Sequence, residues 1–406
     1  MYGQEIINSN SAVIKVMGVG GGGCNAINSM ISSNVSSAEF IAVNTDNQAL
    51  LLSKADKRIQ IGTKLMKGLG AGSDPNIGEQ AAEESKEEIA SYLEGTDLLF
   101  IAAGMGGGTG TGAASVIARL AREMGILTVA VVTKPFSFEG KVRNANANKG
   151  IANLKKHVDT LVIIPNDKLL QFLPAQTGML DAFKVADDML KQGIVGIVDL
   201  IATPSLINLD FADVNTVMRN QGLAHMGIGR AKGENRIIEA VRQAVSSPLL
   251  ETTIEGAKSV ILNVTGGKDL MLTEINEAAT LVQGIIDDSA NIIFGATVDE
   301  TMVDEVKITV IATGFNASES IETEAIAVKP AIQFAQNKPA RSEDNIPPLL
   351  KVFESAENPE VEMETEVVSE PVKIEPVIAE TPVEEPKREE PKGRELPAFM
   401  RKLFKK

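Results

Sequence analysis

The sequence predicts an α/β fold in which helices cover both faces of a doubly wound parallel sheet, joined to a smaller α/β domain. Residues 13–19 (VIKVMGV) form a near-continuous apolar run, which is typical of a strand buried on both faces of a parallel sheet. Strand and helix patterns then alternate along the chain, the order that produces such a sheet. Two of the strands run directly into glycine-rich loops, and sheets of this kind bind ligands at the carboxyl ends of their strands.

Each further strand of the first domain is predicted from a short apolar run that follows a helical stretch. These runs lie at residues 40–43, 97–103, 126–133 and 160–165. A long helix is predicted next, at residues 179–201. At 1.5 Å per residue it would extend about 35 Å, far enough to cross a domain. It is apolar around much of its circumference, so we expect it to lie buried between two domains.

The chain of 406 residues is longer than one hydrophobic core usually supports, so two domains are expected. The pattern changes after residue 222, and a second, smaller α/β domain is predicted up to residue 316. Its expected strands are residues 259–264, 291–296 and 306–313, and its expected helices are residues 234–245 and 272–286.

Composition excludes several classes of function. With one cysteine, Cys24, no disulfide framework can form, which fits a reducing cytoplasm. No apolar run is long enough to cross a bilayer and no signal-peptide pattern opens the chain, so a cytoplasmic protein is expected. A net charge of −15 disfavours binding to nucleic acid. The chain has only two histidines, His157 and His225, which makes a zinc site or a histidine-based triad unfavourable.

Composition changes sharply near Val328. Eleven of the 17 prolines lie from Pro330 onward, but only one of the 35 glycines does. Residues 341–395 contain 16 acidic and 7 basic side chains. Such a segment cannot bury enough apolar surface to offset its chain entropy, so an acidic, disordered linker is predicted.

The last eleven residues form a separate unit with helical periodicity. Apolar side chains recur at the i, i+3, i+4, i+7, i+8 positions of an amphipathic helix, and four basic residues accompany them. A peptide of this type on a long tether suits docking in a groove of a partner protein. A helix on a membrane surface and a basic solubilising end are the alternatives. The apolar positions are Leu396, Phe399, Met400, Leu403 and Phe404.

The first glycine-rich loop, residues 18–23 (GVGGGG), follows the first strand. Glycines let backbone amides approach an anion closely, and the helix that follows adds a favourable dipole. The loop also satisfies the G-x-G-x-x-G pattern, and Asp46 stands after the second strand, where dinucleotide enzymes place a ribose-binding acid. Alone, this loop would favour a Rossmann-type, nicotinamide-dependent dehydrogenase.

The second loop, residues 104–112 (GMGGGTGTG), makes a dinucleotide less favourable as the ligand. It follows a different strand and also precedes a helix, so two phosphate cradles face one crevice. That arrangement suits a nucleoside di- or triphosphate. A P-loop is disfavoured because both Gly-Lys pairs, at Lys141 and Lys268, lack a following Ser or Thr.

The motif GGGTGTG at residues 106–112 resembles the signature loop of the tubulin/FtsZ superfamily, and the surrounding chain resembles the FtsZ family of bacterial division GTPases. The matching motifs follow the family's order over nearly the whole chain. Cys24 departs from the family, which usually has glycine or asparagine there. The other motifs are GVGGGG (18–23), NTD (44–46), GLGAGSDP (68–75), FEGKVR (138–143), NLDFADV (208–214) and LPAFMR (396–401).

The resemblance implies which residues bind GTP or GDP. Backbone amides of both glycine loops would hold the phosphates, and Ala71 with Gly72 would approach the γ-phosphate. Glu139 and Arg143 would contact the sugar region, Phe183 would stack on the base, and Asn25 with Asp187 would recognise guanine. The full implied set is Gly20, Gly21, Gly22, Gly23, Cys24, Asn25, Asn44, Asp46, Ala71, Gly72, Gly107, Gly108, Thr109, Gly110, Thr111, Glu139, Arg143, Asn166, Phe183 and Asp187.

The loop after the long helix has two interpretations. From the residues alone, Asp210 would cap the next helix and Asp213 would lie in its first turn, facing the helix dipole. The resemblance implies instead that this loop enters the nucleotide site of the next subunit. There Asp210 and Asp213 would orient the attacking water, with Asn208 supporting them.

The resemblance also implies a GTPase activated by head-to-tail assembly into filaments of the bacterial division ring. Mg²⁺ would be held mainly by phosphates and water, without a protein ligand that the sequence identifies. Membrane-anchoring and regulatory division proteins would bind the terminal peptide through Leu396, Pro397, Phe399, Met400 and Arg401. The expected divisions are a flexible N-terminus (1–10), a nucleotide-binding domain (11–177), the central helix (178–202), the catalytic loop with its helix (203–222), the second domain (223–316), the linker (317–395) and the terminal peptide (396–406).

Overall fold

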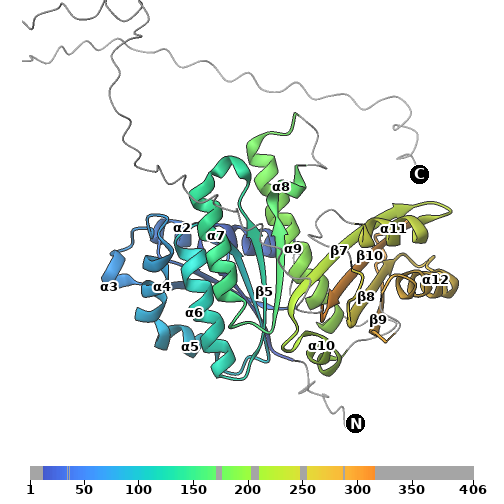
Figure 1. Cartoon of the computed structure of the whole chain (residues 1–406), viewed down its shortest axis with the longest axis horizontal. Helices are drawn as coiled ribbons and strands as arrows, with labels where there is room; N and C mark the ends of the chain where they lie inside the picture. The colour runs from blue at the N-terminus through green and yellow to red at the C-terminus, as the bar shows by residue number, and fades with distance from the viewer. Residues whose placement is uncertain are drawn as a thin grey trace, which may run out of the picture. The chain divides into compact units, whose positions relative to one another are not determined.

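The fold is organised around one sheet with the strand order β3-β2-β1-β4-β5-β6-β7-β10-β8-β9 (Figure 1). The computed structural model describes residues 12–33, 35, 37–170, 176–202, 210–246, 254–286 and 289–315. All of them belong to the first of two units, Met1–Ala327, and the second unit is Val328–Lys406. Asn208, the acidic linker and the terminal peptide therefore lie outside the described residues.

The first six strands are parallel and show the doubly wound order 3-2-1-4-5-6. They are buried because helices cover both faces, which explains their near-continuous apolar sequences. The predicted fold class is confirmed. Their bounds are β1 Ile14–Val19, β2 Glu39–Asn44, β3 Lys57–Gln60, β4 Leu98–Gly104, β5 Leu127–Lys134 and β6 Thr160–Pro165.

Two hydrophobic clusters, one on each face, hold the helices of this half against the sheet. Helices α4, α5, α6 and α7 contribute to one cluster, and α1 contributes to the other. The bounds are α1 Gly20–Ser32, α2 Asn47–Leu51, α3 Thr63–Met66, α4 Pro75–Glu84, α5 Lys86–Leu93, α6 Thr109–Glu123, η1 Ser137–Glu139, α7 Lys141–Leu154 and α8 Asn166–Leu169.

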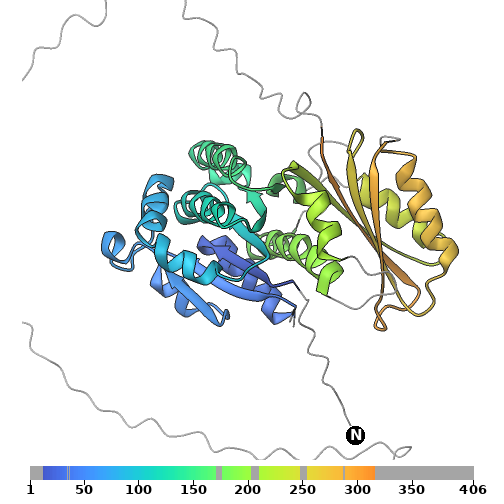
Figure 2. The same cartoon turned by 90° about the horizontal axis from the view of Figure 1, so that it is seen from below.

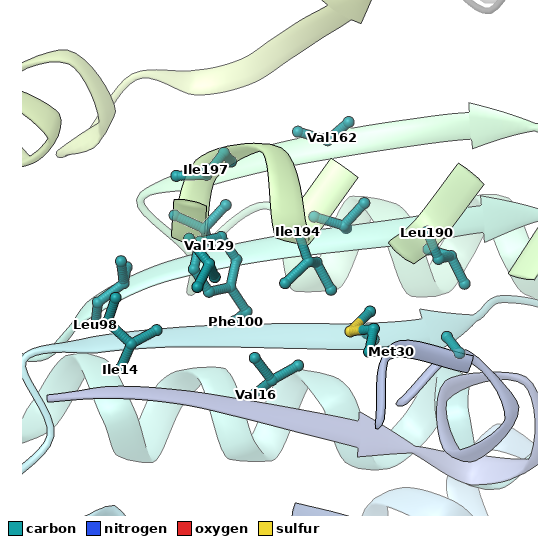
Figure 3. Close-up of a cluster of buried hydrophobic side chains, with 14 of the residues drawn as sticks. Ile14, Val16, Met30, Leu98, Phe100, Val129, Val162, Leu190, Ile194 and Ile197 are labelled. Carbon is teal, nitrogen blue, oxygen red and sulfur yellow. The ribbon is translucent and has the colours of Figure 1, made fainter. Parts of the chain in front are cut away.

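The long central helix, α9 (Met179–Ala202), was predicted to within one residue. Its buried side chains Leu190, Ile194 and Ile197 lie over Val129 of β5 and Phe100 of β4, as Figure 3 shows. The same cluster continues into the second half of the sheet through residues of β8 and β10. Helix α9 therefore packs against both halves, as its wide apolar surface predicts.

The second half of the sheet is mixed. Strand β7 pairs in parallel with β6 and antiparallel with β10, while β8 and β9 are parallel to each other. Helices α11 and α12 cover the face opposite α9 (Figure 2). The bounds are α10 Phe211–Met218, β7 Gly222–Lys232, α11 Arg236–Val245, β8 Ser259–Gly266, α12 Leu272–Gln283, β9 Asn291–Val298 and β10 Glu305–Thr313.

Within the described ranges, no helix combines the length and apolar character needed to span a membrane.

Candidate functional site

The two glycine-rich loops lie side by side at the point where the strand order reverses. Strands β1 and β4 are hydrogen-bonded neighbours, with Val19 opposite Ala103 near their carboxyl ends. The chain leaves β1 into α1 on one face of the sheet and leaves β4 into α6 on the other. Diverging connections at a switch point open a crevice at the edge of the sheet, which is the usual ligand position in this architecture.

The N-termini of α1 and α6 both open at this crevice without a capping side chain. Neither helix has an acidic residue in its first turn. The first backbone N–H groups of a helix lack intrahelical partners and carry the positive end of the dipole. Two such ends beside one crevice can therefore bind a negatively charged group without any basic side chain.

Glycines of these loops serve two different needs. At Gly23, an added Cβ would stand 2.2 Å from the carbonyl oxygen of Ala102, so the residue is required for close packing of α1 on β4. At Gly21 and Gly107, an added Cβ would meet no atom within 4 Å. Packing within the chain does not require glycine at these two positions, which is consistent with space and amides kept open for a ligand.

A cavity of about 420 Å³ occupies the crevice. The cavity brings together fifteen of the residues implied by the resemblance, from both glycine loops, the loop before α4, the start of α7, α8 and α9. These residues are Gly21, Gly22, Asn44, Asp46, Ala71, Gly72, Gly107, Gly108, Thr109, Gly110, Glu139, Arg143, Asn166, Phe183 and Asp187.

Five implied residues do not line this cavity, and their role toward a nucleotide stays a prediction. Gly20 and Gly23 pack against neighbouring backbone, and Asn25 is exposed. The hydroxyl of Thr111 accepts a hydrogen bond from the Gly106 N–H at 2.8 Å, which holds the second loop in shape.

Cys24 is also set back from the cavity. Its Sγ lies 3.5 Å from the carbonyl oxygen of Gly18 and 3.9 Å from that of Val43. Burial raises the pKa of the thiol to about 12, so it remains protonated and unreactive at neutral pH.

Helix α9 supplies an aromatic ring and a carboxylate to the wall opposite the glycine loops. The ring of Phe183 meets Phe136 and Phe138 edge to face, at centroid distances of 5.4 and 6.4 Å. These contacts fix the ring as a surface on which a base can stack. Burial raises the pKa of the Asp187 carboxyl to about 6, and the charge of Asp188 adds to that rise. A carboxylate of this kind favours a ligand that donates hydrogen bonds.

The remaining wall combines fixed and unpaired polar groups. Glu139 Oε2 forms an ion pair with Arg143 Nε at 2.9 Å, and Glu139 Oε1 accepts a hydrogen bond from the Phe136 N–H at 2.8 Å. In contrast, Asn166 Oδ1 is buried and has no hydrogen-bond partner among the described residues. Buried polar atoms are rarely left unpaired, so this oxygen points to a ligand that donates to it.

Asp46 lines the cavity and also caps a helix. Its carboxylate accepts hydrogen bonds from the N–H groups of Gln48, at 2.8 Å, and Ala49, and so caps α2. This contact gives Asp46 a structural role that needs no dinucleotide.

The two aspartates after the central helix form a capping box. Asp213 N–H donates to Asp210 Oδ1 at 2.8 Å, and Asp210 N–H donates to Asp213 Oδ2 at 3.3 Å. The capping interpretation is therefore confirmed. Asp210 is exposed, and neither carboxylate lines the cavity of its own chain.

Several lining residues were not in the predicted set. Gly104 is the last residue of β4, and Thr133 is the next-to-last residue of β5. The carboxyl ends of parallel strands were already expected at this edge, so the sequence carried a signal for both residues. Ala186 and Leu190 are ordinary apolar positions of a helix, and no sequence signal marks them. The additional lining residues are Ala49, Gly70, Ser73, Gly104, Met105, Thr133, Pro135, Ala186 and Leu190.

Across the residues that the structure describes, no group of three or more His, Cys, Asp or Glu side chains is placed to hold a metal ion.

Comparison with known proteins identifies relatives for both halves. The profile of the Tubulin/FtsZ family GTPase domain matches residues 13–174, and the profile of the FtsZ family C-terminal domain matches residues 222–316. The structure of an FtsZ dimer from M. jannaschii, described as empty, is 48% identical and covers 76% of this chain and 90% of that chain, with a TM-score of 0.73. The GTPγS-bound protofilament of CetZ2 from Haloferax volcanii is 21% identical and covers 76% and 94%, with a TM-score of 0.66, a likeness of fold alone.

Proposed function

Because the chain belongs to the FtsZ family of tubulin-like GTPases, we propose that it binds GTP in the crevice between β1 and β4 and hydrolyses it on assembly into filaments. The observation that carries this proposal is the convergence of two uncapped helix N-termini and the Asp187 carboxylate on one cavity. The first feature suits phosphates, and the second suits a base with hydrogen-bond donors.

Guanine fits the donor requirement of this wall. Its N1–H and N2 amino group present two adjacent donors, which one carboxylate can accept together. Adenine has no such pair, so Asp187 would discriminate between the two bases. Phe183 would stack on the ring, and the unpaired Asn166 Oδ1 would accept a further hydrogen bond from the ligand.

The loop before α4 would sense the third phosphate. Ala71 and Gly72 line the cavity, and Gly72 and Ser73 have positive φ angles of 57° and 65°. The left-handed region costs a serine free energy, so a γ-phosphate that accepts hydrogen bonds from this loop could stabilise a conformation that is otherwise unfavourable. Loss of the phosphate would release it.

Hydrolysis requires a second copy in this proposal. Asp210 and Asp213 do not line the cavity of their own chain, yet Asp210 is exposed at the start of α10. In a head-to-tail contact, the carboxylates of one copy would enter the site of the next and orient the attacking water, with Asn208 in support. Such a contact is heterologous and builds an open filament unless it closes into a ring. The M. jannaschii relative is described as a dimer.

Mg²⁺ would neutralise the phosphates in this site. Phosphate oxygens and water would supply its ligands, as is common for this ion. The residues of this chain would bind and orient the nucleotide and would place the water.

We further propose that the filaments form the division ring at the cytoplasmic side of the membrane. Leu396, Pro397, Phe399, Met400 and Arg401 would bind membrane-anchoring and regulatory proteins. Deleting residues 396–406 should leave GTP hydrolysis unchanged and abolish binding to such an anchor in a pull-down assay. Loss of hydrolysis in the deletion variant would contradict a separate role for this peptide.

Ligand identity is tested directly by equilibrium binding of GTP, GDP, ATP and NAD to the full chain. We expect GTP and GDP to bind and to compete with each other, and ATP and NAD to bind at least about a hundredfold more weakly, as expected when two charge-assisted hydrogen bonds are lost. Binding of NAD without binding of GTP would overturn the proposal in favour of a dehydrogenase.

A further inference from the structure

A second cavity, of about 440 Å³, lies between α9 and the sheet of the second half. It is separate from the nucleotide crevice and has a strongly charged lining. Arg230 of β7 and Lys307 of β10 form part of one wall, and Lys191 and Asp199 of α9 form part of the other. Ser33, at the end of α1, closes one side.

The two cations on the sheet are placed unfavourably for the chain alone. Arg230 and Lys307 are directly opposite each other in the antiparallel β7–β10 ladder, so their side chains leave the same face as neighbours. Like charges at directly opposed positions destabilise a sheet. Neither cation forms an ion pair within the described part of the chain.

The nearest carboxylates do not offset this repulsion by direct contact. Asp299 accepts hydrogen bonds from the N–H and the hydroxyl of Thr301, at 2.9 and 2.6 Å. Asp199 forms no ion pair with another described residue. Burial raises the pKa of its carboxyl, while the charge of Lys307 acts to lower it. Burial and the charge of Arg230 lower the pKa of Lys307, which agrees with a cation that lacks a close partner.

Arg236, in the same half of the molecule, is an example of an arginine with a structural role and direct carboxylate partners. Its guanidinium is 6% exposed, pairs with Asp269, and lies 2.7 Å from Glu274 Oε1. Asp304 is within 3.6 Å. Arg236 thus has carboxylates on several sides. In contrast, Arg230 is exposed, and Arg230 and Lys307 line a cavity that contains one carboxylate, Asp199, among its described lining residues.

We propose that this second cavity binds a small multivalent anion, one that carries phosphate or carboxylate groups, through Arg230 and Lys307. The anion would supply counter-charge in direct contact with both cations, which Asp199 and Asp299 do not provide, and would form charge-assisted hydrogen bonds to both side chains. Ser33 and Thr309 provide hydroxyl groups at the same cavity.

Helix α9 lines both cavities, so a ligand in the second cavity could affect the nucleotide site through this helix. Asp187 and Leu190 of α9 line the first cavity, and Lys191 and Gln192, the next turn of the same helix, line the second. A ligand that fixes α9 against the sheet would therefore change nucleotide affinity, and the nucleotide would change anion affinity by the same factor. This consequence rests on the proposed function, whereas anion binding itself does not.

Binding is tested by titrating the full chain, in excess GDP, with inorganic phosphate and separately with succinate, at constant ionic strength maintained with sodium chloride. Calorimetry and thermal unfolding are the two readouts. Saturable binding of at least one probe is expected, with affinity about tenfold weaker in Arg230→Gln and in Lys307→Gln. The matched control is Lys232→Gln, on the same strand, whose partner is Glu305 at 3.1 Å and which does not line the cavity.

A purely structural role for the two cations predicts a different result. In the absence of anion, both variants should unfold at a temperature equal to or above that of the unmodified chain, because the repulsion is relieved. Saturation by phosphate alone assigns a phosphate-bearing ligand, and saturation by succinate alone assigns a carboxylate. The proposal would be overturned if neither phosphate nor succinate stabilised the unmodified chain. It would also be overturned if either anion stabilised both variants as much as the unmodified chain, or if Lys232→Gln lost the stabilisation equally. Lower stability of both variants without anion would also overturn it.

Discussion

Asp187 illustrates how a single position acquires a function from its surroundings. On the sequence it is one of two adjacent acidic residues in a helix. In the fold it faces the cavity beside Phe183, while Asp188 forms an ion pair with Lys191 outside that cavity. Burial disfavours the charged form of Asp187, and donors from guanine would favour it, so the carboxylate is suited to recognise a base but is costly when the site is empty.

The raised pKa of Asp187 gives a pH prediction with a definite sign. Its value in the folded chain is about 6, above the ordinary 3.8, so ionisation weakens the nucleotide-free fold as the pH rises from 3.8 to about 6. GTP needs the ionised form, so its affinity should fall about tenfold per pH unit below the folded pKa. Isothermal titration across this range measures both the affinity and the proton release.

Two variants serve as controls for this pH dependence. Asp187→Asn should bind GTP at least about tenfold more weakly at neutral pH and should show no such dependence, because a charged acceptor is lost. Asp188→Asn changes the neighbouring carboxylate and should retain the slope. A slope that survives in Asp187→Asn would show that another group titrates.

The residues of the candidate site were not all predictable from the sequence in the same way. The glycine loops were predicted from chemistry, because glycine and a following helix make an anion site wherever they occur after a parallel strand. Asp187 and Phe183 were predicted only through resemblance, since a helical acid and a helical aromatic are ordinary alone. Asn25 and Thr111 were predicted by the same route, and the structure places them away from the cavity wall.

At the scale of the element, the N-cap residue of α10 has a structural role and a proposed catalytic one. Asp210 caps the helix, and its carboxylate is exposed at the start of that helix. Removing the side chain therefore changes both the stability of the helix and any contribution to hydrolysis. A test must separate the two effects.

Asparagine at position 210 separates them, because it caps a helix about as well as aspartate does. Asp210→Asn should unfold like the unmodified chain, whereas Asp210→Ala should lose about 1 kcal/mol of the free energy of unfolding. Both should bind GTP normally and hydrolyse it about a hundredfold more slowly or worse, as expected when a water-orienting carboxylate is removed. Full hydrolysis by Asp210→Asn would exclude the carboxylate from the reaction.

Most elements were predictable because their periodicity is strong. Helix α9 and the strands β1, β4 and β5 are long and apolar, and they agree with prediction to within about two residues, the usual uncertainty of element ends. Strands β3 and β7 were missed. Strand β3 (KRIQ) is short, charged and at the sheet edge, and β7 contains three glycines and a mixture of polar residues, so neither shows the apolar run that marks a buried strand.

The glycines of β7 have a tertiary cause that no local pattern reveals. At Gly227 and Gly229, an added Cβ would stand 1.8 and 1.9 Å from carbonyl oxygens of α11. The strand therefore accepts glycine in order to let this helix pack closely. Close helix–strand contact overrides the preference for β-branched residues.

At the scale of the whole molecule, the sheet connects the candidate site to the rest of the fold. Strand β7 continues the parallel sheet from β6 and then pairs with β10, while α9 packs on both halves. The nucleotide crevice lies at the carboxyl edge of the first half. The capping box of α10 lies where the chain leaves α9 and returns to begin β7, at Gly222 opposite Thr160, the amino end of β6. The candidate nucleotide site and the two aspartates of the capping box thus lie toward opposite edges of the sheet.

Separation of the two halves predicts that hydrolysis depends on contact between copies. If the proposed head-to-tail contact completes the site, GTPase activity per molecule should rise with protein concentration above a threshold. Asp210→Asn should remain inactive at every concentration. Activity that is independent of dilution would indicate a site complete within one chain.

The most direct measurement mixes two variants with complementary defects. In the proposed mechanism, Asp210→Asn keeps a working nucleotide site but lacks the water-orienting carboxylate, and Asp187→Asn keeps that carboxylate but binds GTP weakly. The GTP concentration is kept too low for either variant to hydrolyse GTP appreciably on its own. Under these conditions an equimolar mixture should hydrolyse GTP, because the loop of Asp187→Asn completes the site of Asp210→Asn. A mixture no more active than the sum of its components would contradict a site shared between two copies.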